Sequence, residues 1–197
     1  MRPDRILTAL RRFWTGNAGT VAVETVIMIP LLFTGLMFAH EFYGYMRLQS
    51  VQEKASYTVA DMLARETTVV DDTYIDNTKE LFDMLTNNAD TSQVRISVLR
   101  YHFNESENID EYELRWTELR GEGDMTELAE ADVRTAHEEH DTFPDTLAGQ
   151  DLIMVETRSI YTPVISVTDG LMDGKAVTTR TFMPVRFAPQ LCFTGVC

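Results

Sequence analysis

The sequence is poor in cationic residues, and the common catalytic signatures and internal repeats are absent from it. Its 197 residues include 17 Lys and Arg against 31 Asp and Glu, a formal net charge of −14. Phosphate contacts require Lys and Arg, so this charge argues against a nucleic-acid partner. The chain contains no Gly-x-Ser-x-Gly elbow, phosphate-binding loop or dinucleotide fingerprint. No period of 20 to 50 residues indicates a solenoid. We therefore expect no enzyme and no cofactor.

Residues 21–39 form an apolar run that contains a single acidic side chain, Glu24. About nineteen helical residues span roughly 28 Å, close to the thickness of a bilayer core. A carboxylate inside such a segment costs about 3 kcal/mol on insertion scales. We therefore expect a transmembrane segment over residues 20–40, in contact with membrane lipid, and a partner or a function for Glu24.

The charges on the two sides of this run predict its orientation. Residues 1–19 carry four arginines and one aspartate, and the positive-inside rule places such a leader in the cytoplasm. The rest of the chain has thirteen Lys and Arg against thirty Asp and Glu, and its length does not prevent export. Ordinary signal cleavage after Ala39 is disfavoured because Met37 stands where a small residue is needed. The outer domain is thus expected in the periplasm or beyond.

A glycine lies at the cytoplasmic end of the run, five residues before the carboxylate. The stretch reads Gly19-Thr20-Val21-Ala22-Val23-Glu24, with Pro30 further along. The basic leader, the glycine, the glutamate and the apolar helix together resemble the class III signal peptide of type IV pilins. Within that group they most resemble the TadE/TadF-like minor pilins, or pseudopilins, of the tight-adherence (Flp, type IVc) pilus system. The similarity covers about residues 11–45, with a looser match at residues 161–163 and 186–192.

The resemblance implies cleavage between Gly19 and Thr20 by a prepilin peptidase of the bacterial inner membrane. It also implies two further kinds of partner, namely other pilins or pseudopilins and the inner-membrane pilus assembly platform. Major Flp pilins consist of little more than the helix, so a chain of this length resembles a minor pilin and not the repeating subunit.

Cleavage would create a free amine on Thr20, four residues before Glu24 on the same helix. In an assembled filament this amine could pair with Glu24 of a neighbouring subunit and fix the axial register, because a buried charge without a partner is strongly penalised. The alternative is that Glu24 lies near the headgroups and reaches out to water.

Helical periodicity continues beyond the membrane and predicts one helix over about residues 21–66. A second helix is expected from an acidic cap within Asp71-Asp72-Thr73 to the stop at Asn87 and Asn88. The apolar positions of the first helix outside the run recur every three or four residues: Phe42, Tyr45, Leu48, Val51 or Gln52, Ala55, Val59, Met62 and Leu63.

The period then changes to two, which predicts strands near residues 94–99, 112–117, 152–161 and 177–186, the first two joined by a hairpin loop over 104–111. The expected fold class is α+β and pilin-like, with a long N-terminal transmembrane helix packed on a small antiparallel sheet. The expected organisation is a basic leader over residues 1–19, the membrane segment over 20–40 and the outer domain over 41–197.

Two further features were weighed as sites. His137-Glu138-Glu139-His140 lies in the acidic segment 121–150, where a short helix over 126–140 is possible; two histidines without an evident third ligand favour a solvated surface over a metal site. Cys192 and Cys197 are the only cysteines, and their spacing in an exported domain favours an intramolecular disulfide. Two free thiols or an intermolecular bridge are the alternatives.

These observations favour a minor pilin or pseudopilin that takes part in assembly, priming or tip formation of a tight-adherence pilus. It would be a single-pass protein of the bacterial inner membrane, with a cytoplasmic N-terminus. The alternative is an uncleaved single-pass membrane protein whose periplasmic domain senses or binds a ligand.

Overall fold

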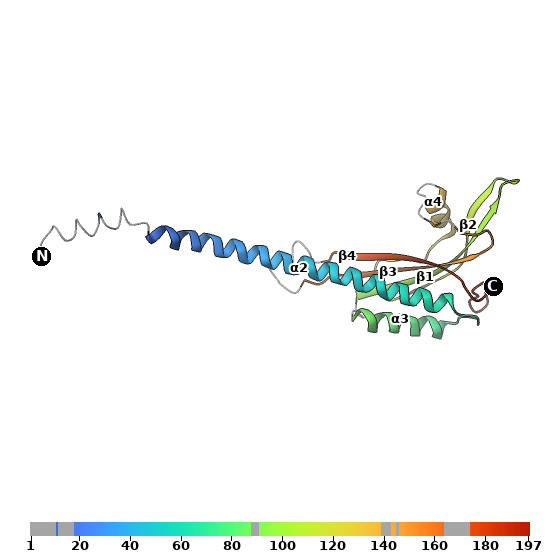
Figure 1. Cartoon of the computed structure of the whole chain (residues 1–197). Helices are drawn as coiled ribbons and strands as arrows, with labels where there is room; N and C mark the ends of the chain where they lie inside the picture. Colours follow the sequence, from blue (N-terminus) through green and yellow to red (C-terminus); the bar gives the residue numbers. More distant parts are fainter. Residues whose placement is uncertain (1–10, 12–17, 88–90, 139–142, 145, 164–173) are drawn as a thin grey trace, which may run out of the picture. The chain divides into compact units, whose positions relative to one another are not determined.

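The computed structural model describes residues 11, 18–87, 91–138, 143–144, 146–163 and 174–197. The chain divides into two compact units, Met1–Tyr43 and Gly44–Cys197. Helix α2 (Ala18–Ala64) runs through both, and the second unit adds α3 (Asp72–Thr86), a short α4 (Glu130–Glu138) and four strands (Figure 1). The leader over residues 1–19 therefore lies almost entirely outside the described residues.

Helix α2 confirms the predicted long helix and continues without interruption through Pro30. Within the second unit its apolar stripe faces the sheet, and Gln52, Ala55 and Val59 are buried. The sequence left Val51 and Gln52 as alternatives, and the structure buries Gln52. Phe42, the first of the recurring apolar positions, is 55% exposed.

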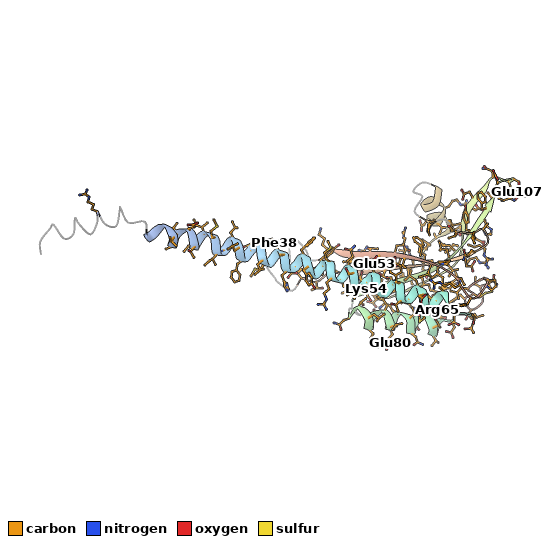
Figure 2. All side chains as sticks on the ribbon, in the orientation of Figure 1. Phe38, Glu53, Lys54, Arg65, Glu80 and Glu107 are labelled. Atoms are coloured by element: carbon orange, nitrogen blue, oxygen red, sulfur yellow. A yellow bond between two sulfur atoms is a disulfide. The ribbon has the colours of Figure 1, made fainter. Side chains whose placement is uncertain are left out.

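Charged residues occupy the opposite face of α2 in this unit. Glu53 and Lys54 project from α2 into solvent, Arg65 does so directly after the end of this helix, and Glu80 does so from α3 (Figure 2). The charged side chains are thus kept out of the core, whereas the buried side of the helix includes the polar Gln52 and Ser56 beside its apolar residues.

Helix α3 begins and ends at the expected residues. Asp71 is the N-cap, and its carboxylate accepts a hydrogen bond of 2.8 Å from the Tyr74 amide. Asn87 is the C-cap, with the left-handed φ of 52° that asparagine tolerates better than most residues.

The sheet is antiparallel throughout and has the strand order β2-β1-β3-β4, with β1 (Ser92–Asn104), β2 (Ile109–Arg120), β3 (Asp151–Ile160) and β4 (Ala176–Pro184). The predicted hairpin loop over 104–111 was too long. Only residues 105–108 leave the ladder, and Asp110 and Glu111 belong to β2. Their charged side chains are exposed, so they do not oppose strand formation.

One face of the sheet packs on α2 and α3 and forms the larger core. Val94, Ile96 and Val98 of β1 alternate toward this face, and the bulge between Val98 and Leu99 then changes the register. The remaining members are Ala55, Val59, Ala60, Leu63, Ala64, Val70, Ile75, Phe82, Trp116, Ile153, Val155, Val185 and Leu191.

The opposite face carries a second core that includes residues of the acidic segment 121–150. Val133 of α4 and Phe143 are buried against Leu99, Tyr112, Leu152 and Met154. The expected helix over 126–140 is shorter, because α4 covers only Glu130–Glu138. An acidic segment can therefore supply core residues, since a few apolar side chains are enough to hold it on the sheet.

Candidate functional site

The membrane-length part of α2 exposes apolar side chains all around. In the part of the chain that the structure describes, α2 is the one helix long and apolar enough to cross a membrane. Val21, Leu32 and Leu36 are 65%, 66% and 68% exposed. Thr25 and Thr34 donate their hydroxyls to the carbonyls of Val21 and Pro30 at 2.7 and 2.8 Å, so these polar groups are satisfied inside the helix. No described part of the chain covers this apolar surface, which is what a segment that crosses a membrane would show.

The residues of the expected processing site lie at the start of this helix. Gly19 and Thr20 fall in the first turn of α2, and an added Cβ at Gly19 would meet nothing within 4 Å. Glu24 is exposed and forms no hydrogen bond or ion pair with any described residue. The glycine is therefore not required by packing against any described residue, and the carboxylate has no partner among them.

A C-terminal clasp, residues 185–197, closes one end of the second unit. Cys192 and Cys197 are joined by a disulfide, with their Cα atoms 4.7 Å apart. The Val70 amide donates to the Cys192 carbonyl at 2.9 Å, and the Thr194 amide donates to the Val70 carbonyl at 2.9 Å. The Arg186 amide donates to the Ala64 carbonyl at 2.9 Å. The tail is thus bound to the turn between α2 and α3.

That turn contains a carboxylate whose titration is shifted. Glu66 accepts hydrogen bonds from the Thr68 hydroxyl at 2.7 Å, the Thr68 amide at 3.2 Å and the Thr67 amide at 3.0 Å. The hydrogen bond from the Thr68 hydroxyl, followed by that from its amide, lowers the pKa of Glu66 below its usual 4.5.

Asp151 connects the clasp to the sheet. Its side chain is 1% exposed; Oδ1 accepts a hydrogen bond from Arg100 Nε at 2.7 Å, and Oδ2 accepts one from the Leu191 amide at 3.1 Å. The Leu191 carbonyl in turn accepts the indole N–H of Trp116 at 2.8 Å. Sequence reasoning missed this arrangement because an aspartate at a strand end gives no local sign of burial.

A second buried carboxylate lies between two arginines on the other face of the sheet. Glu156 Oε2 is bonded to Arg95, and Oε1 accepts a hydrogen bond from Arg180 Nε at 2.8 Å. Arg95 also donates to the Thr126 carbonyl at 2.6 Å. The three side chains carry a net positive charge, in contrast to the rest of this acidic protein.

A pocket of about 550 Å³ opens beside Arg180, along the edge of the sheet. It is lined by Tyr57, Pro144, Thr146, Leu147, Gln150, Leu152, Arg180, Thr181, Phe182 and Pro184. The sequence gave no indication of it, because its walls come from four separate segments.

Gly44 has a steric role where the second unit begins. A Cβ there would lie 2.7 Å from the hydroxyl oxygen of Tyr161, whose ring packs edge-on against Tyr45 with centroids 5.7 Å apart. The glycine therefore permits the close approach of the Tyr161 side chain. Tyr161 lies in residues 161–163, one of the two segments with the looser resemblance described above.

Glu139, His140 and the side chains of His137 and Glu138 lie outside the described residues, and the solvated surface expected there stays a prediction. Elsewhere in the described ranges no group of three or more His, Cys, Asp or Glu side chains could hold a metal ion. His102 instead pairs with Glu113 at 2.8 Å.

Comparisons with family models, curated proteins and solved structures gave no match.

Proposed function

We propose that the protein is a minor pilin or pseudopilin that takes part in assembly, priming or tip formation of a bacterial tight-adherence pilus. The observation that carries the proposal is that Gly19 precedes Glu24 by five residues at the N-terminal end of α2. The apolar side chains that follow Glu24 along this helix are exposed. The α+β outer domain with its long N-terminal helix is consistent with a pilin-like subunit.

Processing is the first step. A prepilin peptidase in the inner membrane cuts after Gly19, on the cytoplasmic side of the apolar run. The absence of a Cβ leaves the peptide bond accessible, and no described residue lies within 4 Å of a Cβ added at Gly19. The requirement for glycine therefore arises from the peptidase and not from folding.

Assembly is the second step. When a subunit leaves the bilayer, its exposed apolar surface must be covered by the helices of neighbouring subunits, because apolar area in water is unfavourable. Glu24 then pairs with the N-terminal amine of a neighbour, which neutralises both charges and fixes the register. A helix shifted by one turn would leave both charges buried and unpaired.

The proposal is tested by intact-mass measurement of protein extracted from membranes that contain the prepilin peptidase. We expect a chain that begins at Thr20. Gly19→Leu should leave the full-length precursor in the membrane, because the larger side chain crowds the peptidase. Gly35→Leu is the matched control, since Gly35 lies in the same helix and also has nothing within 4 Å of an added Cβ. It should be processed normally.

A wild-type chain that begins at Met1 in the presence of the peptidase would contradict the proposal. That result would favour the uncleaved single-pass protein with a sensing or ligand-binding outer domain.

A further inference from the structure

The two edge strands of the sheet, β2 and β4, differ in what covers their outer sides. At one edge, α4 covers the outer side of β2, and the Leu114 amide donates to Glu130 Oε2 at 2.9 Å. At the other edge lies β4, and no described strand or helix pairs with its outer side (Figure 1). Exposed edges present unpaired backbone groups and invite a further strand, so proteins usually cover them.

The hydrogen-bond pattern identifies which backbone groups of β4 point outward. The Val185 amide donates to the Asp151 carbonyl at 3.1 Å, and the Tyr161 amide donates to the Lys175 carbonyl at 2.9 Å. Between these two pairs the register is unbroken. Because antiparallel pairs alternate, the odd-numbered residues of β4 bond to β3 and the even-numbered ones face away. The amides and carbonyls of Thr178, Arg180 and Phe182 therefore point outward and bond to no described group.

The pocket of about 550 Å³ lies along this same edge. Tyr57 and Thr181 line it on the side of α2, whereas Phe182, Leu152 and Leu147 line it on the other side. An added strand would place its side chains alternately on the two sides. Its backbone would meet β4, and one of its side chains would enter the apolar part of the pocket.

The charge of the residues that line the pocket determines which side chain of an added strand can lie beside it. Arg180 is the only charged side chain among the described lining residues. It shares the buried Glu156 with Arg95, so the group of three retains one positive charge, and Arg180 presents it to solvent because its side chain is 41% exposed. A carboxylate on the incoming strand would complement this charge, whereas a cation would be repelled.

We propose that β4 and this pocket bind an extended segment of another exported protein, which adds as an outer strand. It places a carboxylate side chain opposite Arg180 and an apolar side chain opposite Phe182. Backbone hydrogen bonds supply affinity and the two side-chain positions supply selectivity. A second copy of this chain fits less well, because symmetric pairing about Arg180 would set two guanidinium groups opposite each other. The proposal does not depend on processing at Gly19.

The test uses the full chain in nanodiscs and an acetylated, amidated peptide, Thr-Val-Thr-Glu-Thr-Val-Thr. Hydrogen exchange at residues 176–184 is measured with and without the peptide. In the free protein we expect fast exchange at the amides of Thr178, Arg180 and Phe182 and slow exchange at the odd-numbered amides between them. Bound peptide should slow the three fast amides by about tenfold or more.

Variants separate the contribution of the Arg180 charge from that of the backbone hydrogen bonds. Arg180→Gln should weaken binding of the Glu peptide about tenfold through loss of a charge-assisted contact. A peptide with Lys in place of Glu should not bind the wild-type protein. Thr178→Pro removes one outward amide without breaking the ladder to β3, and should weaken binding. Thr178→Val keeps that amide and is the matched control.

Three results would overturn the proposal. The first is slow exchange at the three even-numbered amides of the free, monomeric protein. The second is equal binding of the Glu and Lys peptides, or none of either. The third is concentration-dependent protection of β4 in the free protein with a doubling of mass, which would assign the edge to a second copy.

Discussion

Removal of the Asp151 carboxylate should release the C-terminal clasp. In Asp151→Ala, Arg100 loses its ion-pair partner and keeps only its hydrogen bond to Gln190, and the Leu191 amide loses its acceptor. Breaking one side of a buried ion pair costs about 3–5 kcal/mol, and an orphaned buried amide adds about 1 kcal/mol. Arg100 is 19% exposed and can recover part of its hydration, so we expect a total of about 4 kcal/mol. For a unit of this size, that corresponds to a decrease in Tm of about 10 °C.

The fluorescence of Trp116 reports release of the clasp directly, since its indole N–H donates to the Leu191 carbonyl. Thermal unfolding is followed by tryptophan fluorescence in a non-ionic detergent, in a Trp14→Phe background that leaves Trp116 as the only tryptophan. Asp151→Asn keeps an acceptor for Leu191 and loses only the charge, so its Tm should lie between those of wild type and Asp151→Ala. A double variant, Arg100→Met with Asp151→Asn, should cost less than the sum of the two single changes, because it leaves no unpaired charge.

The reasoning is refuted if Asp151→Ala lowers Tm by less than about 2 °C, which would mean a contribution below about 1 kcal/mol. It is also refuted if the double variant shows additive losses, because Asp151 and Arg100 would then act independently.

Three further outcomes are expected. Glu24→Ala should insert at least as well as wild type and be processed normally, yet fail to crosslink to pilin partners and fail to support piliation; normal piliation would exclude the proposed pairing. Cys192 and Cys197 should resist alkylation without reductant, and Cys192→Ser with Cys197→Ser should cost no more than about 2 kcal/mol, since the enclosed loop is short; full labelling of native protein would show free thiols. Because the folded pKa of Glu66 is lowered, its stabilisation is present above pH 4.5 and lost as the pH falls through the folded value. The stability difference between wild type and Thr68→Val should therefore be largest near neutral pH and vanish in acid; a constant difference down to pH 3 would contradict it.

The amino-acid sequence determined the features that depend on neighbours along the chain. Asp71 and Asn87 set the ends of α3 because a capping side chain bonds to amides within one turn, and a left-handed residue stops the helix on its own. The apolar run and Glu24 are likewise visible directly, since a membrane selects for length and hydropathy in one continuous segment. The strands followed from alternation: β3 and β4 lie close to their predicted bounds, whereas β1 and β2 extend several residues further toward their shared hairpin.

Only the tertiary structure decided which polar residues are buried and which strand forms the open edge. Asp151 and Glu156 look like any other acidic residues of a chain with net charge −14, and their burial depends on Arg100, Arg95 and Arg180 brought from distant positions. Strand order is equally invisible, because alternation shows that a strand has two faces but not which strand pairs with it. A local sequence pattern shows whether a segment faces water, lipid or a protein core. It does not show which distant segments the two cores bring together, and these decide the ion pairs, the neighbouring strands and the pocket beside β4.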